Sequence, residues 1–216
     1  ENEEMFLHDP RTGQICWKSN DMTGPFFNFS NTKANDWFVN QIGAELTREQ
    51  DINAVFFDET DWLYCGPVFN NCSHAVITPD QYHNKIKMMA RLAKLLNAAG
   101  IWPIYSTFNG FSDTKYRDCP FPYDEYYTAL AEVGWFRFYE LGIGNTKPEG
   151  GSGSQAQIRQ ALRESELGLP VIVHAYFDKK PDPGNTPRTL PLALFLLVQT
   201  DYWYLGISSG WMASDW

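Results

Sequence analysis

Short runs of large apolar residues recur along this chain and alternate with segments of helical periodicity. The runs are rich in Val, Ile, Phe, Tyr and Trp, and they span residues 25–30, 52–59, 101–109, 135–142, 170–177 and 202–209. Each has the length of a strand, and a near-continuous apolar run is typical of a strand buried on both faces. Strand and helix in alternation predict parallel strands that are joined by right-handed crossovers.

The clearest predicted helix is TPDQYHNKIKMMARLAKLLNAAG, residues 78–100. Thr78 and Gln81 have the spacing of a capping box, Pro79 suits the first helical position, and Gly100 supplies a stop. An apolar stripe recurs every three or four residues and predicts packing on a sheet; it consists of Ile86, Met89, Leu92, Leu95 and Leu96. Further helices are predicted over residues 32–46, 123–134, 154–168 and 190–199.

The spacing of the later runs narrows the fold class. From residue 101 onward, predicted strands begin near residues 101, 135, 170 and 202, an interval close to the roughly 30 residues of one strand and its crossover helix. This rhythm favours an α/β fold of the (β/α)8 TIM-barrel type in a single domain, 1–216. A doubly wound sheet has the same periodicity, but its usual glycine-rich phosphate turn does not follow the first run.

A closed barrel of this type needs eight strands, and about six strand-helix units are visible. Either residues 1–24 contain another strand, in MFLHD or QICWK, or the first units are missing at the N-terminus. We favour the second interpretation. Because open sheet edges expose unpaired backbone, a partner chain or a missing segment is expected to complete the barrel.

Charge and hydropathy limit the class of partner. The net charge is -9 and the isoelectric point is about 4.9, so nucleic acid and anionic membrane surfaces would be repelled. No apolar run approaches the roughly 20 residues of a membrane span, and the first residues, ENEEMF, lack the features of a signal peptide. These observations predict no membrane insertion, no nucleic-acid binding and a neutral ligand.

The cysteines and two glycosylation motifs favour an extracellular or secretory-pathway protein. Cys16, Cys65, Cys72 and Cys119 form no CxxC pair with a zinc-like spacing, so disulfides are preferred to metal. Cys65 and Cys72 flank the loop GPVFNN and are predicted to pair, which leaves Cys16 with Cys119, although four cysteines allow three connectivities. The Asn-x-Ser motifs begin at Asn28 and Asn71, and Asn71 is the better candidate because its loop is polar.

Polar residues follow the apolar part of nearly every predicted strand. In parallel barrels the carboxyl ends of the strands converge on one mouth, where catalytic groups lie. Asp58 and Glu59 follow the run at residues 54–57, and Glu140 ends the run at residues 135–142. Two carboxylates across a cleft suit glycosidic cleavage, in which one donates a proton and the other attacks or activates water. We therefore predict Asp58 and Glu140 as the catalytic pair, with Glu59 as the substitute for Asp58.

The same mouth supplies candidate substrate contacts. Aromatic planes suit the C–H faces of sugar rings, and polar groups can hold hydroxyls. The predicted substrate-binding residues are Asp61, Trp62, Tyr105, Asn109, Tyr139, His174, Tyr176 and Trp211. No cofactor and no metal are predicted, although the acids at residues 58–61 are also an arrangement that calcium could bind, and His174 on an apolar strand is often only a core histidine.

Several segments also resemble one family. FNFSNTKANDWFVNQI, INAVFFDETD, WFRFYELG and YLGISSGW are similar to motifs of glycoside hydrolase-like TIM barrels. The resemblance implies a carbohydrate-active barrel, with Asp58 or Glu59 at its fourth strand and Glu140 at its sixth as functional acids. Asn53 and Ala54 depart from the family's usual Asp-Gly before the apolar run, and its early strands have no counterpart.

Three functions from different classes follow. The first is hydrolysis of an extracellular polysaccharide or glycan, with Glu140 as general acid and Asp58 as nucleophile or base. The second is an inactive barrel that binds glycans or builds an extracellular assembly. The third is an α/β enzyme with other chemistry, such as an esterase, which the sequence disfavours because it has no GxSxG elbow.

Overall fold

The computed structural model describes residues 3–17, 24–49, 51–57, 66–69, 72–107, 128–129, 131–134, 136–142, 161–176 and 189–208. The chain forms two compact units. The first comprises Glu1–Asn53, Leu63–Ile101 and Lys115–Ala129, and the second comprises Ala54–Trp62, Trp102–Thr114 and Leu130–Trp216. The sequence prediction of a single domain stays a prediction.

A parallel five-stranded sheet forms the framework of the second unit. Its strands are β1 (Ala54–Phe57), β4 (Trp102–Thr107), β5 (Phe136–Gly142), β6 (Val171–Tyr176) and β7 (Trp203–Ser208). They pair in the order β1-β4-β5-β6-β7, and every pair is parallel. Neighbours in the sheet are therefore also successive among these five strands along the chain, as expected for strands joined by crossover connections.

The prediction of a (β/α)8 barrel is wrong. In the described part of the chain the sheet has five strands, and β1 and β7 form its two ends instead of closing on each other. The regular spacing of the apolar runs correctly predicted parallel strands. Closure depends on pairing between the first and last strands, and periodicity contains no information on that pairing.

Register divides the described side chains of the sheet into two faces. Because successive residues of a strand point to opposite faces, residues in register across parallel strands share a face. The Tyr105 face comprises Val55, Phe57, Pro103, Tyr105, Val171, Val173, Trp203 and Leu205, and the His174 face comprises Ala54, Phe56, Trp102, Ile104, Ile172, His174 and Tyr204. On the Tyr105 face, Tyr105 and Val171 are fully buried.

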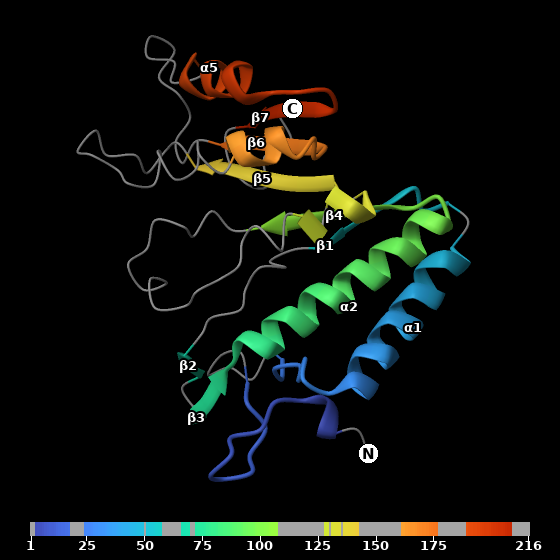
Figure 1. Cartoon of the computed structure of the whole chain (residues 1–216), viewed down its shortest axis with the longest axis vertical. Helices are drawn as coiled ribbons and strands as arrows, with labels where there is room; N and C mark the ends of the chain where they lie inside the picture. The colour runs from blue at the N-terminus through green and yellow to red at the C-terminus, as the bar shows by residue number, and fades with distance from the viewer. Residues whose placement is uncertain are drawn as a thin grey trace, which may run out of the picture. The chain divides into compact units, whose positions relative to one another are not determined.

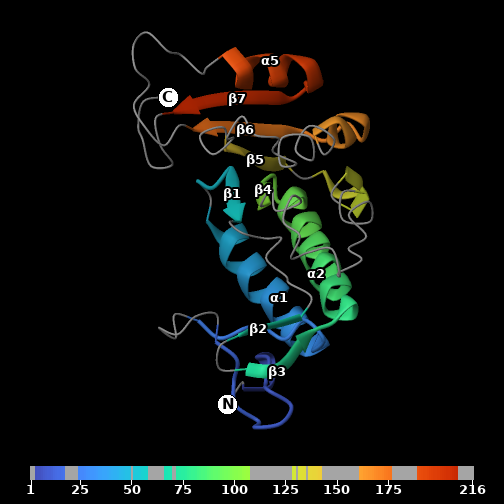
Figure 2. The same cartoon turned by 90° about the vertical axis from the view of Figure 1, so that its left-hand side faces the viewer.

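Helix α5 (Thr189–Val198) packs beside β7, as Figure 2 shows. Phe195 on the helix contacts Trp203 on the strand, with ring centroids 6.4 Å apart, and both side chains are buried. Since Trp203 belongs to the Tyr105 face, α5 covers that face at the β7 end. Another helical segment, residues 161–166, precedes β6 and buries Ala161 and Glu164.

Two long helices lie side by side in the first unit (Figure 1). In α1 (Thr32–Arg48), the side chain of Asn31 caps the first turn by accepting a hydrogen bond from the Ala34 N–H. In α2 (Pro79–Ala98), the capping box of Thr78 and Gln81 is present as predicted. The predicted stripe on α2 is largely buried, with Leu92 and Leu96 completely so, and its Leu95 side chain lies against Gly43 of α1.

Close packing between these helices depends on one glycine. An ideal Cβ built on Gly43 of α1 would lie 2.9 Å from a methyl carbon of Leu95 on α2, which is closer than real Cβ contacts. The absence of a side chain at Gly43 therefore lets the two helices approach each other. At the surface, Arg91 and Asp36 form an ion pair of 2.7 Å between the same helices.

The run at residues 25–30 was predicted as a parallel strand, and this prediction is wrong. Isolated antiparallel bridges join Phe6 to Phe27, His8 to Ile15 and Trp17 to Pro25. MFLHD and QICWK therefore contribute to a short antiparallel ladder with residues 25–27. A second antiparallel pair was not predicted at all. Its first strand, β2 (Gly66–Phe69), lies in the segment GPVFNN that was interpreted as a loop, and its second, β3 (Cys72–Ile77), follows that segment.

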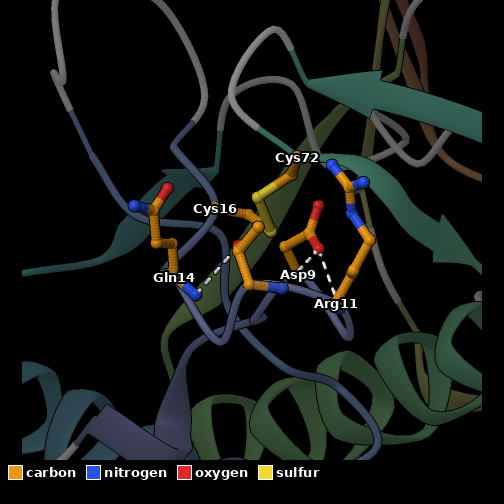
Figure 3. The surroundings of a disulfide bond; sticks show 6 residues. Asp9, Arg11, Gln14, Cys16 and Cys72 are labelled. Carbon is orange, nitrogen blue, oxygen red and sulfur yellow. Dashed lines mark hydrogen bonds between the residues drawn. A yellow bond between two sulfur atoms is a disulfide. The ribbon is translucent and has the colours of Figure 1, made fainter.

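A disulfide joins the ladder to β3 (Figure 3). It links Cys16 to Cys72, with Cα atoms 5.5 Å apart and both residues completely buried. The predicted pairing of Cys65 with Cys72 is therefore wrong, and so is that of Cys16 with Cys119. Beside the disulfide, the buried carboxylate of Asp9 accepts hydrogen bonds from the Arg11 and Thr12 N–H groups and shapes the turn before Gln14.

Candidate functional site

The predicted catalytic acids fall on different parts of the described chain. Phe57 ends β1, and Asp58 and Glu59, which follow it in the sequence, lie outside the described residues. So do other predicted site residues: Asp61, Trp62, Asn109, Trp211, Asn71, Cys65 and Cys119. Glu140 lies within β5, where the structure describes its backbone position.

Glu140 and His174 occupy neighbouring positions in the sheet. They are register partners on the parallel strands β5 and β6, and Gly206 on β7 is the next residue in the same row. Adjacent strands lie about 4.8 Å apart, so residues in register are direct neighbours. The structure therefore brings together one predicted catalytic acid and one predicted substrate-binding residue.

His174 is deeply buried. Its exposed fraction is 1%, although it belongs to the sheet face that also contains exposed aromatic side chains. Burial disfavours the charged imidazolium, which lowers the pKa of His174 from its ordinary value of 6.5. The imidazole is therefore held in its uncharged form at neutral pH. An uncharged imidazole can donate one hydrogen bond and accept another.

Register separates other predicted substrate residues from this row. Tyr105 belongs to the opposite face, where its fully buried ring stacks on Phe57 with centroids 4.9 Å apart. Tyr139 pairs in register with Val173 and so falls in the same set as Tyr105. Tyr176 lies two positions beyond His174 on β6, in the row of Gly142 and Ser208. The position of Tyr176 is therefore on the same face of the sheet as the positions of Glu140 and His174. The positions of Tyr105 and Tyr139 are on the opposite face.

Three exposed aromatic residues on the His174 face were missed by sequence reasoning. Phe56, Trp102 and Tyr204 are 44%, 52% and 54% exposed. They were interpreted as strand core because the runs appeared apolar throughout. The alternation of side chains along a strand could have identified them, because every second residue points to the same face. Phe56 is in register with Ile104, Trp102 lies two residues before Ile104, and Tyr204 lies two residues before Gly206, the register partner of His174. These rings provide flat apolar surface on the face that includes His174.

Asn28, one of the predicted glycosylation sites, lies where the chain enters α1. Its side-chain oxygen accepts a hydrogen bond of 3.1 Å from the Ser30 N–H, which closes an Asx-turn over the motif. The residue is partly exposed, and Ser30 is exposed. Asn71, the candidate that the sequence favoured, lies outside the described residues.

The described residues contain neither a cluster of metal-binding side chains nor a helix that could span a membrane. Within them, no three His, Cys, Asp or Glu side chains gather as a metal site requires. Within the same ranges, no helix combines the length and the apolar character needed for a membrane crossing. The calcium alternative concerned the acids at residues 58–61, which lie outside these ranges.

Comparison with protein-family models finds no match for this chain, and comparison with curated proteins finds no similar sequence. The resemblance to glycoside hydrolase-like barrels thus stays a prediction.

Proposed function

We propose that this chain hydrolyses glycosidic bonds, with Glu140 as the general acid and Asp58 as the nucleophile or base. The observation that supports the proposal most is the strand order. β1, which directly precedes Asp58 in the sequence, is separated from β5, which contains Glu140, by β4 alone, and all three strands are parallel. Parallel strands direct their carboxyl ends to the same edge of a sheet, where α/β enzymes bind ligands.

The spacing of the strands fits the chemistry. Two strand spacings amount to about 9.6 Å between the axes of β1 and β5. Glycosidases hold their two carboxyl groups about 5 Å apart when they retain configuration and about 6.5 to 9.5 Å apart when they invert it. The register adds an offset along the strands, because Phe57 is level with Tyr105 and Arg137, and Glu140 lies three residues beyond Arg137. The proposal therefore requires side chains that lean toward each other across this offset as well. Glu59 remains the substitute for Asp58 in this proposal.

Exposed aromatic rings support a carbohydrate substrate. Phe56, Trp102 and Tyr204 present apolar surface on the face that includes His174. Sugar rings bind such surfaces through their C–H faces, and a neutral glycan avoids the repulsion that a chain of net charge -9 exerts on anions. The same rings support the second candidate, a glycan-binding or structural protein without turnover.

The proposal includes an extracellular or secretory-pathway location. A completely buried disulfide between Cys16 and Cys72 is typical of proteins that fold in an oxidising compartment. The partly exposed Asx-turn at Asn28 presents an acceptor motif for glycan.

Turnover of glycans tests the proposal. The purified chain is incubated with a panel of neutral polysaccharides and aryl glycosides, and released reducing ends are measured. We expect Glu140→Gln to reduce kcat by about 10²- to 10⁴-fold, the usual contribution of a general acid, while glycan binding is retained. Asp58→Asn is expected to act similarly.

Asp201→Asn provides the matched control, because it removes an exposed acid just before β7 without touching the proposed pair. Its activity is expected to equal that of the unmodified chain. Binding to the panel without any release of sugar favours the non-catalytic candidate. Full activity in Glu140→Gln rules out the assigned general acid.

A further inference from the structure

We infer that Asn28 is an acceptor of an N-linked glycan, and that the fold keeps its amide nitrogen available for this modification. The inference rests on the secretory-pathway location in the proposed function, and it does not depend on hydrolysis. The sequence favoured Asn71 over Asn28 because of its polar loop, whereas the local structure of Asn28 supplies the argument for this site.

The backbone and side chain of Asn28 are held by three hydrogen bonds. The Asn28 N–H donates one of 2.8 Å to the carbonyl oxygen of Met5, and the Asn28 carbonyl oxygen accepts one of 3.0 Å from the Asn31 N–H. The side-chain oxygen accepts the third from the Ser30 N–H, at 3.1 Å, which closes the Asx-turn. The Asn-x-Ser motif therefore has a defined conformation in the folded chain.

The middle residue of the motif, Phe29, is anchored. Its ring centroid lies 5.2 Å from that of Phe27 and 5.8 Å from the ammonium group of Lys85. Its carbonyl oxygen accepts a hydrogen bond of 2.9 Å from the Nδ2 of Asn35. The two residues that define the motif lie on either side of this anchor, with Asn28 partly exposed and Ser30 exposed.

The amide nitrogen distinguishes Asn28 from the next two asparagines. The Nδ2 of Asn31 donates a hydrogen bond of 2.9 Å to the Glu4 carbonyl oxygen, and that of Asn35 donates to Phe29. Asn35 is also buried. No described residue accepts a hydrogen bond from the Nδ2 of Asn28. The Asn28 nitrogen can therefore carry a substituent without the loss of a hydrogen bond.

The modification joins this nitrogen to the first sugar of an oligosaccharide that is linked to a lipid diphosphate. A bond forms between Nδ2 and the anomeric carbon, the bond from that carbon to the lipid diphosphate breaks, and Nδ2 loses one proton. The side-chain oxygen is unchanged, so the hydrogen bond from the Ser30 N–H persists in the product. A glycan is bulky and solubilising, and a partly exposed position gives it access to water.

Peptide mass spectrometry tests the site. The full chain is produced in eukaryotic cells behind a secretory leader, and the secreted and retained material is digested before and after enzymatic release of N-linked glycans. We expect the peptide that contains Asn28 to carry glycan and the release to convert Asn28 to Asp. Because the leader supplies the compartment, this result does not depend on the location proposed for the chain.

Two variants separate the glycan from the turn. Ser30→Ala removes the hydroxyl group that the motif requires but keeps the backbone N–H that closes the Asx-turn, whereas Asn28→Gln removes the acceptor and the turn together. Both are expected to lose the glycan at this site. Asn71→Gln, which removes the other motif, is the control and is expected to leave the glycan at Asn28 in place.

Unmodified Asn28 in the chain that has entered the secretory route overturns the inference, whether or not Asn71 carries glycan. So does an equal loss of mass on glycan release from Ser30→Ala and from the unmodified chain. Glycan at Asn28 in a chain that releases no sugar from the substrate panel refutes hydrolysis and leaves this inference intact. Turnover by a chain whose Asn28 is unmodified refutes this inference and leaves hydrolysis intact.

Discussion

The indole N–H of Trp203 donates a hydrogen bond of 2.9 Å to the backbone carbonyl oxygen of Leu169, 34 positions earlier in the chain. Both residues are buried, and the Trp203 ring also contacts Phe195 on α5. One side chain therefore connects β7 to the segment before β6 and to α5. Backbone pairing adds to this connection, since the Val171 N–H donates to the carbonyl oxygen of Tyr202.

Replacement of Trp203 by Phe should destabilise the chain. The change keeps an aromatic ring but leaves the buried Leu169 carbonyl without its indole donor, which costs about 1 to 3 kcal/mol. Urea unfolding measures the difference. Tyr204→Phe, on the exposed neighbouring residue, is the control and should change the free energy of unfolding by no more than about 0.5 kcal/mol. Equal effects of the two changes would contradict the assigned role of the indole.

Gly43 should tolerate Ala and reject Leu. Alanine gains about 1 kcal/mol of helix propensity, which offsets the overlap of its Cβ with the mobile end of Leu95. Leucine adds bulk that the contact between α1 and α2 cannot accept, and we expect a loss of about 1 to 3 kcal/mol. Ala44→Leu, one residue along on the exposed side of α1, is the matched control. Thermal unfolding of the three variants provides the measurement.

Local sequence signals predicted where the helices and strands of this fold lie better than they predicted which strands pair with each other. The parallel strands β1, β4, β5, β6 and β7 were each located by an apolar run, and α2 was located by its cap. The run at residues 25–30 was equally aromatic, yet it forms antiparallel bridges. Aromatic content indicates an extended segment but does not determine the direction of its neighbour.

The disulfide was mispredicted for a related reason. Cys65 and Cys72 were paired because they are close in the sequence, but the entropy of closing a loop rises only slowly with its length. A link over 56 positions is therefore not strongly disfavoured, and the structure has this longer link. The candidate site follows the same pattern: Glu140 and His174 were each selected from the sequence, while their pairing came from strand register.

Loss of the disulfide should reduce stability substantially. It closes a long loop, so Cys16→Ser with Cys72→Ser should lower the free energy of unfolding by about 2 to 4 kcal/mol. Denaturant unfolding of the unmodified chain and the double variant measures this loss. Each single variant leaves a buried thiol without its partner and serves as a control. A double variant as stable as the unmodified chain would show that this link contributes nothing to the fold.

His174 should make the chain less stable in acid. Its folded-state pKa lies below the ordinary value of 6.5, so the unfolded chain binds the proton more readily than the folded chain does. The stability contributed by the uncharged ring is complete above pH 6.5 and is lost as the pH falls from there through the lowered pKa.

His174→Gln removes this titration, so its free energy of unfolding should decline less than that of the unmodified chain between about pH 7.5 and pH 5. Urea unfolding at both values gives the comparison, and titrations of other groups cancel between the two proteins. If His174→Gln loses as much stability in acid as the unmodified chain, the buried uncharged ring is not the source of the acid sensitivity.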